Sequence, residues 1–274
     1  MNVSGKTKIA GIFGYPIEHT LSPLMHNAAF KSIRFDACYV AFKVSPDALP
    51  DAVQAIRCLN MLGINITVPH KEKVIPLLDN VNEEASFIGA VNTITNTDGI
   101  LTGYNTDGRG FISSLSEEGI SVDGKNILII GTGGASRAIS YYLSEKALTL
   151  SLFDIDRQKA EKLVSDLSQI RSNVSHLETI DITLKPDVII NATPLGLKPD
   201  DPLPLNPDMI TPDMVICDLV YKKTNLLKEA ELTGAKTIDG SGMLLWQGVL
   251  AFELWTGVKP PVEIMREMLL SKIR

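Results

Sequence analysis

A glycine-rich turn in the second half of the chain has the composition of a phosphate-binding loop. Gly131-Thr132-Gly133-Gly134-Ala135 follows the apolar run NILII (126–130) and precedes a helical pattern. Gly131 would permit a tight turn, Gly133 would let a pyrophosphate approach the backbone, and the helix N-terminus would supply N–H donors. Ser136 stands where the G-x-G-x-x-G fingerprint has its third glycine. The strand–turn–helix context nevertheless favours a dinucleotide site over a plain turn.

Two carboxylates follow the next apolar run. Asp154-Ile155-Asp156 ends the strand pattern, and Arg157 begins a helical one. In a dinucleotide-binding fold, a carboxylate at this point accepts hydrogen bonds from the adenosine ribose and repels a 2′-phosphate. One aspartate could instead cap the helix, which would leave the other for the ribose. The local charge therefore favours NAD(H) over NADP(H).

Polar residues in the first half gather in four stretches, each at a strand end or a strand-to-helix junction. The stretches are HTLSP (19–23), NITVPHK (65–71), AVNT (90–93) and GYNTDG (103–108). In α/β sheets the strand ends face the ligand crevice. The stretches offer hydroxyls, amides, the Lys71 ammonium and the Asp107 carboxylate, a set suited to a charged ligand rich in hydroxyl groups.

The elements that must position these residues alternate between strand and helix. In the first half we expect strands at 8–14, 38–44 and 64–69, helices at 22–33 and 46–62, helical stretches at 71–78 and 82–86, and a hairpin over 90–108 that turns at Asp98-Gly99. Gly63 would stop the second helix. In the second half we expect strands at 126–130, 148–156, 187–196 and 214–221, and helices after the glycine turn and at 157–170, 242–254 and 261–273.

This alternation predicts an α/β protein of two domains. We expect a mainly parallel α/β substrate domain at 1–110 and a Rossmann-type dinucleotide-binding domain at 111–239. The helices of 240–274 would return to the first domain. A length of 274 residues agrees with two domains.

Composition narrows the class of protein. A net charge of −6 argues against a nucleic-acid surface, and no apolar run approaches the length of a membrane span. Cys38, Cys58 and Cys217 are expected to be buried thiols in a reducing compartment. The N-terminal residues have no signal-peptide pattern. We expect a cytoplasmic protein with a small-molecule substrate, and the oligomeric state stays open between monomer and homodimer.

The ordered set of motifs resembles the shikimate dehydrogenase family over nearly the whole chain. The motifs are GYPIEHTLSPLMHNAAF, NITVPHK, GAVNT, GYNTDGRGF, GTGGAS, NATPLG and DGSGMLLWQG. The resemblance implies reversible reduction of 3-dehydroshikimate to shikimate with a nicotinamide cofactor, on the route to chorismate and the aromatic amino acids.

The resemblance also implies roles for residues in the substrate site. Lys71 and Asp107 match the family's catalytic pair. The substrate contacts it implies are Thr20 and Ser22 for the carboxylate, Thr67, Asn92, Gln247 for the ring hydroxyls, and Tyr221 in the pocket wall. Thr20 departs from the family's Ser-x-Ser pair, since it keeps the hydroxyl and adds a methyl group.

On the cofactor side, the resemblance places five residues beside the nicotinamide half. They are Asn191, Thr193, Leu219, Gly240 and Met243. Glu83 aligns with an acidic position on the cofactor side. NADP-using members carry Asn-Arg-Thr where this chain has Asp154-Ile155-Asp156. The family default is thus NADP(H), whereas the local sequence favours NAD(H).

Several of these residues also have plain structural interpretations. Lys71 could be a solvated lysine at a helix start, and Asp107 and Ser22 could be helix N-caps. His19, His26 and His70 lack neighbours at metal-ligand spacing, which favours core packing or hydrogen bonding over a metal site.

Three other functions compete with a shikimate dehydrogenase. The acidic strand end favours an NAD-dependent quinate/shikimate dehydrogenase. A non-catalytic sensor is disfavoured by the presence of both Lys71 and Asp107. A folate-linked dehydrogenase is disfavoured by GYNTDG and NATPLG.

Overall fold

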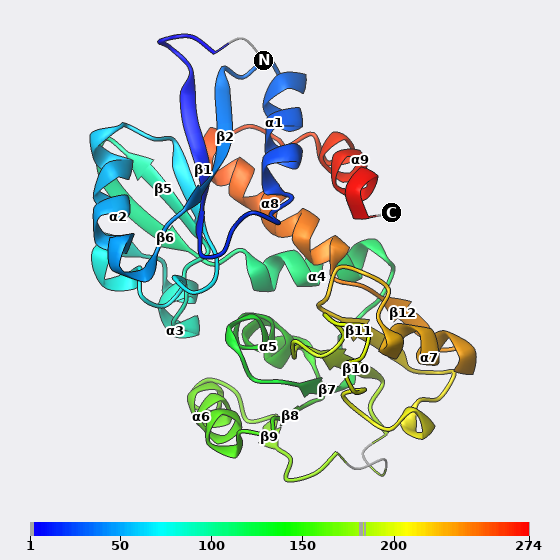
Figure 1. The fold of residues 1–274 in the computed structure, drawn as a ribbon. Coiled ribbons are helices and arrows are strands. Elements are labelled where there is room, and N and C mark those ends of the chain that lie inside the picture. The colour runs from blue at the N-terminus through cyan, green and yellow to red at the C-terminus, as the bar shows by residue number, and fades with distance from the viewer. Residues whose placement is uncertain (1–2, 181–182, 184, 274) are drawn as a thin grey trace. The chain divides into compact units, whose positions relative to one another are not determined.

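The chain forms two compact units, each built around its own sheet (Figure 1). A computed structural model describes residues 3–180, 183 and 185–273. The first unit comprises residues 1–106 and 245–274, and the second comprises 107–244. One boundary precedes Asp107, and the other falls inside helix α8 (Ser241–Thr256).

The first unit contains a six-stranded mixed sheet in the order β2-β1-β3-β5-β6-β4. Its strands are β1 (Lys8–Gly14), β2 (Ala37–Lys43), β3 (Gly63–Ile66), β4 (Asn80–Val81), β5 (Thr93–Thr97) and β6 (Ile100–Tyr104). β1 pairs in parallel with β2 and β3, and β4 pairs in parallel with β6. β5 runs antiparallel to β6, as the hairpin at Asp98-Gly99 requires, and it also runs antiparallel to β3.

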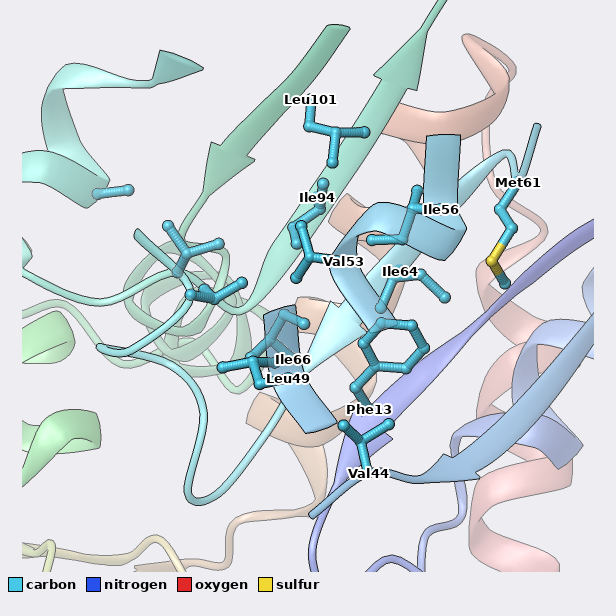
Figure 2. Close-up of a cluster of buried hydrophobic side chains, with 13 residues drawn as sticks. Phe13, Val44, Leu49, Val53, Ile56, Met61, Ile64, Ile66, Ile94 and Leu101 are labelled. Carbon is cyan, nitrogen blue, oxygen red and sulfur yellow. The ribbon is translucent and has the colours of Figure 1, made fainter. Parts of the chain in front are cut away.

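An apolar core lies between this sheet and helix α2 (Leu49–Cys58). Figure 2 shows Leu49, Val53 and Ile56 pointing toward side chains of the strands. The strand partners in the cluster include Phe13, Ile64, Ile66, Ile94 and Leu101. Because side chains alternate across a strand, Asn65 faces away from this cluster.

Aromatic side chains make up a second core that joins helix α1 (Ser22–Ser32), β2 and α8. The His26 and Tyr39 rings stack with centroids 4.4 Å apart, and Trp255 lies 5.3 Å from His26. Trp255 Nε1 donates to the Ile94 carbonyl at 2.9 Å. A Cβ on Gly63 would lie 2.2 Å from that Nε1, so only glycine fits beneath the indole. Helix α9 (Val262–Ile273) packs along α1.

The second unit contains a fully parallel sheet in the order β12-β11-β10-β7-β8-β9. Its strands are β7 (Asn126–Ile130), β8 (Thr149–Phe153), β9 (Val174–His176), β10 (Val188–Asn191), β11 (Val215–Asp218) and β12 (Lys236–Ile238). Its helices are α4 (Asp107–Glu117), α5 (Gly134–Lys146), α6 (Arg157–Ser168) and α7 (Asn225–Thr233). This strand order is that of a doubly wound dinucleotide-binding fold, which confirms the expected fold class.

Several local predictions need correction. Residues 71–78 form turns and a 3₁₀ helix, Ile75–Leu77, because Pro69 and Pro76 restrict the backbone. Helix α2 ends at Cys58 and not near Gly63, because Asn60 adopts a left-handed conformation. The expected helix at 82–86 is α3 (Glu83–Ile88), capped by the Asn82 side chain.

Other corrections concern helix starts and one thiol. Ser22 is the first residue of α1 and Leu21 holds the N-cap position, so Ser22 is not a cap. Asp107 likewise begins α4 within the helix. Cys58 is exposed in the last turn of α2, whereas Cys217 is buried and Cys38 half-buried. Helix α7 and the short strands β4, β9 and β12 were not expected.

Candidate functional site

The glycine turn of the second unit lies between β7 and α5. Gly131 has φ +96°, which favours glycine, and a Cβ there would lie 2.8 Å from Thr193 Cγ2. Gly133 is the N-cap of α5, and no side chain caps that helix end. A Cβ on Gly133 or Gly134 would meet no atom within 4 Å. The turn therefore offers accessible backbone and uncapped N–H groups, the features that fit a pyrophosphate.

Asp154, just after β8, is hydrogen-bonded to the glycine turn. Its Oδ2 accepts from the Thr132 N–H at 2.7 Å and from the Thr132 hydroxyl at 2.8 Å, and its Oδ1 accepts from the Asp156 N–H at 2.9 Å. Partial burial raises the pKa of Asp154, but these hydrogen bonds outweigh burial and bring the pKa below its usual value. Asp154 therefore carries its negative charge at neutral pH.

The three residues after Asp154 differ in how they are held. Asp156 caps α6, since its side chain accepts from the Lys159 N–H. Arg157 is paired with Glu161 and Glu178, each at 2.8 Å. Ile155 is 96% exposed. Asp156 is thus the capping aspartate, and Asp154 remains beside the turn with acceptor capacity on Oδ1.

The same edge of the sheet continues through β10 and β11. Asn191, the last residue of β10, accepts from the Thr193 N–H and hydroxyl through Oδ1 at 3.1 and 2.6 Å. Its Nδ2 donates to the Leu195 carbonyl and to Asp218 Oδ1 at 3.0 and 3.1 Å. Since Thr193 also packs on Gly131, the loops after β10 and β7 are in direct contact.

A buried polar network crosses the sheet of the first unit. The Tyr39 hydroxyl donates to Asn65 Oδ1 at 2.8 Å, and Asn65 Nδ2 donates to Thr93 Oγ1 at 3.0 Å. The Thr93 hydroxyl donates to Asn92 Oδ1 at 3.0 Å. Burial raises the pKa of the Tyr39 phenol well above its usual value, with the neighbouring Ser22 hydroxyl opposing that shift. Tyr39 therefore stays a neutral donor.

The network ends at helix α8. Asn92 Nδ2 donates to Thr106 Oγ1 at 2.9 Å, and the Thr106 N–H donates back to Asn92 Oδ1 at 2.8 Å. The Thr106 hydroxyl donates to the Gln247 main-chain oxygen at 3.1 Å. Two of the residues expected to contact substrate, Asn92 and Gln247, are thereby joined through Thr106.

Four further substrate-site candidates lie in the first unit. The Ser22 N–H donates to Thr20 Oγ1 at 3.3 Å, so this pair is together at the start of α1. Thr67 follows β3 and donates its N–H to the Phe13 carbonyl at 3.0 Å. Half-buried Lys71 accepts the Val91 N–H on its carbonyl at 2.8 Å, which holds its backbone beside the segment leading to Asn92.

The other candidates are divided between the units. Asp107 is buried at the start of α4, Tyr221 is exposed after β11, and Met243 is buried near the start of α8. Gly240 lies against the Leu219 carbonyl, where a Cβ would come within 2.1 Å of the oxygen. Exposed Glu83 begins α3 in the first unit.

The histidines take different environments. His70 is buried with Nε2 2.8 Å from the Val44 carbonyl, whereas His26 is stacked on Tyr39. His19 is exposed. Over residues 3–180, 183 and 185–273, no three His, Cys, Asp or Glu side chains are grouped as a metal site would need. In the same ranges, no helix has the length and apolar character needed to cross a membrane.

Five buried polar residues that organise the two sheet edges had no individual role in the sequence analysis. Asn65, Thr93 and Thr106 lie inside the polar stretches that it singled out, whereas Tyr39 and Asp218 were missed. Asn65 and Asp218 carried a usable signal, since each is a polar side chain inside or ending a short apolar run that reads as a buried strand. Tyr39 carried none, because tyrosine is common on strands.

Comparison with known proteins places this arrangement in a family. The shikimate dehydrogenase substrate binding domain matches residues 12–94, and the shikimate 5′-dehydrogenase C-terminal domain matches 240–270. A shikimate dehydrogenase (NADP+) of Desulforamulus reducens is 44% identical over 99% of this chain and 97% of its own length.

Solved structures agree in fold over the full length. A crystal structure of a shikimate dehydrogenase in complex with NADP+ superimposes with a TM-score of 0.94 at 40% identity, covering 100% of this chain and 98% of its own. A shikimate 5-dehydrogenase from Listeria monocytogenes in complex with shikimate and NAD gives 0.91 at 36% identity, covering 98% of both chains. With its two sheets, its glycine turn and these full-length relatives, the chain belongs to the shikimate dehydrogenase family.

Proposed function

We propose that this protein reversibly reduces 3-dehydroshikimate to shikimate with a nicotinamide dinucleotide, and that it prefers NAD(H). Most of the residues that bind the hydroxylated carboxylate belong to the first unit, and the second unit binds the dinucleotide. The part of this proposal that concerns the substrate rests on the buried hydrogen-bond network from Tyr39 to Gln247. This network holds Asn92 and the Gln247 segment of α8 in fixed positions.

Reduction of a ketone needs a hydride on the carbonyl carbon and a proton on the oxygen. The reduced nicotinamide supplies the hydride when it is bound. Lys71 donates the proton, since an ammonium can stabilise the developing alkoxide and then protonate it. Asp107, the second residue of the catalytic pair, accepts a hydrogen bond from a substrate hydroxyl. In the oxidation direction, the neutral Lys71 amine takes the proton back.

The remaining polar groups orient the substrate. The Thr20 and Ser22 hydroxyls at the start of α1 bind the carboxylate, where the positive end of the helix dipole adds to the attraction. Thr67, Asn92 and Gln247 bind ring oxygens, and Tyr221 contributes to substrate binding. The methyl group of Thr20 narrows the carboxylate end of the site. This favours shikimate, whose carboxylate-bearing carbon is planar, over quinate, in which that carbon also carries a hydroxyl group.

Cofactor preference follows from the state of the Asp154 carboxylate. It is ionised, fixed to Thr132, and has acceptor capacity for a ribose hydroxyl. A 2′-phosphate brought to this point meets a negative charge. Arg157, the nearest arginine in the sequence, is engaged by two glutamates, so binding a phosphate would require those ion pairs to break.

Initial rates with shikimate and with quinate, each with NAD+ and with NADP+, test the whole proposal. The expected result is the highest kcat/KM for shikimate with NAD+. A tenfold higher kcat/KM with NADP+ would refute the cofactor preference and leave the reaction intact. Higher kcat/KM with quinate would instead assign the protein as a quinate/shikimate dehydrogenase, and activity with neither substrate would refute the reaction.

A further inference from the structure

Asp218 is a buried carboxylate at the end of β11 that none of the roles described so far uses. It is 1% exposed. Its Oδ1 accepts from the Val220 N–H at 3.0 Å and from Asn191 Nδ2 at 3.1 Å, and its Oδ2 accepts from the Thr224 hydroxyl at 2.7 Å. All three donors are neutral groups.

No cation offsets this charge among the residues that the structure describes. Burial raises the pKa of Asp218, and the nearby carboxylate of Asp239 raises it further, while hydrogen bonds from Thr224, Val220 and Asn191 act against the increase. Burying a carboxylate without a cationic partner lowers the stability of the folded protein, and an asparagine of the same shape would avoid that cost. A costly charge at a ligand-facing strand end points to a use in ligand binding.

The position of Asp218 indicates which part of the ligand it affects. It precedes Leu219, and its partner Asn191 holds Thr193, which packs on Gly131 of the glycine turn. Thr193 and Leu219 are residues that we place beside the nicotinamide half of the cofactor. The adenosine half is placed at Asp154, three strands away in the sheet order β11-β10-β7-β8.

We propose that the Asp218 carboxylate biases the nicotinamide site toward the oxidised cofactor. The oxidised nicotinamide ring carries a positive charge that the reduced ring lacks, so a fixed negative charge at this edge stabilises only the oxidised form. Low-dielectric surroundings strengthen the interaction, because water does not screen it. This inference rests on the proposed function, since it requires a nicotinamide dinucleotide in the second unit.

The test compares binding of NAD+, NADH and ADP-ribose to the purified full-length protein and to its Asp218→Asn variant. Asparagine keeps the size of the side chain and can satisfy all three hydrogen bonds if the Thr224 hydroxyl turns to accept. The ratio of the Kd for NAD+ to the Kd for NADH should rise roughly tenfold in the variant. ADP-ribose, which lacks the nicotinamide ring, should bind with unchanged affinity.

Asp187→Asn is the matched control. Asp187 immediately precedes β10 at the opposite, amino edge of the same sheet, and Lys125 offsets its charge at 3.1 Å. This control should leave the ratio unchanged. An unchanged ratio in Asp218→Asn, or equal weakening of all three ligands, would overturn the proposal.

Thr224→Val is a second test variant, and it leaves the Asp218 carboxylate in place. It deletes the hydroxyl donor to Asp218 Oδ2, so both cofactor forms should weaken by similar factors and the ratio should stay within about twofold of the parent. A collapse of the ratio with the carboxylate still present would count against a charge effect. If the parent protein binds neither ADP-ribose nor NAD+, the proposed nucleotide site itself fails, which is a different outcome.

Discussion

Asp154 and Thr132 form a double hydrogen bond in which one carboxylate oxygen accepts both the Thr132 N–H and its hydroxyl, at 2.7 and 2.8 Å. The residue that selects the cofactor by its charge therefore also fixes the shape of the phosphate-binding turn. A substitution at Asp154 acts on both properties together.

The double substitution Asp154→Asn and Ile155→Arg should shift the preference toward NADP+. The arginine replaces a side chain that is 96% exposed, so it can reach a 2′-phosphate without repacking. We expect kcat/KM for NADP+ relative to NAD+ to rise at least about tenfold, the effect of one charge-assisted hydrogen bond. Ile155→Arg alone serves as control and should give a smaller gain, because the Asp154 charge persists. No gain in the double variant would place cofactor selection elsewhere.

Asparagine at position 154 should also cost stability. Its amide nitrogen would face the Asp156 N–H that now donates to Asp154 Oδ1 at 2.9 Å, which places two donors against each other. The free energy of unfolding should fall by about 1–3 kcal/mol in urea titrations.

Lys71→Ala should reduce kcat for shikimate oxidation by roughly 10²–10⁴-fold, the usual contribution of a general acid–base group. Binding of shikimate, measured by calorimetry, should change far less. Lys73→Ala is a matched control, because Lys73 lies two residues away in the same run and is exposed. Equal losses in both variants would indicate a local structural effect and not proton transfer.

His26 should make the protein sensitive to acid. Burial lowers the pKa of His26 to about 3 from the ordinary 6.5. Because the folded-state pKa is the lower one, the unfolded chain binds the proton first, and stability falls as the pH drops from about 6.5 toward 3. The slope reaches about 1.4 kcal/mol per pH unit from this group.

His26→Phe retains an aromatic ring on Tyr39 and removes that titration. Urea unfolding between pH 7 and pH 4.5 should show a shallower loss of stability in this variant than in the parent. His19→Gln changes an exposed histidine in the same segment and should follow the parent curve. Parallel curves for all three proteins would contradict the assignment.

Gly63→Ala should destabilise the first unit by about 1–3 kcal/mol or more, because a Cβ there lies 2.2 Å from Trp255 Nε1 and 2.6 Å from the Ile94 carbonyl oxygen. Combining it with Trp255→Phe should cost less than the sum of the two single changes, since the smaller ring relieves part of the overlap. Gly5→Ala, which meets no atom within 4 Å, is the control and should leave the unfolding midpoint unchanged. Strictly additive costs would mean that the indole is not the obstacle.

Strong local signals in the sequence predicted much of the fold. The apolar run NILII followed by glycines correctly predicted β7 and α5, and Asp98-Gly99 correctly predicted the hairpin turn. The helix predicted at 71–78 was wrong because Pro69 before the segment and Pro76 within it override its helical spacing. The predicted N-cap, Ser22, was wrong by one residue, since Leu21 holds that position. Tertiary contacts can move the end of a helix by one or two residues.

The polar interior was harder to predict than the backbone. The sequence Asp154-Ile155-Asp156 does not show which aspartate caps α6, because both lie close to the start of the helix. Only the fold brings Thr132 to Asp154 and leaves Asp156 as the cap. Tyr39, Asn65 and Thr93 lie on three separate strands, so the contacts among them depend on sheet order and register. Such long-range hydrogen bonds leave no local pattern.

The network from Tyr39 to Asn92 has a direction. Each group donates to the next, so Asn92 Oδ1 receives the Thr93 hydroxyl and the Thr106 N–H, and both of its lone pairs are occupied. The Asn92 side-chain oxygen therefore cannot accept a further hydrogen bond from a ligand. Tyr39 on β2, at the other end of the network, sets this direction because its hydroxyl has a single proton and donates it to Asn65 Oδ1.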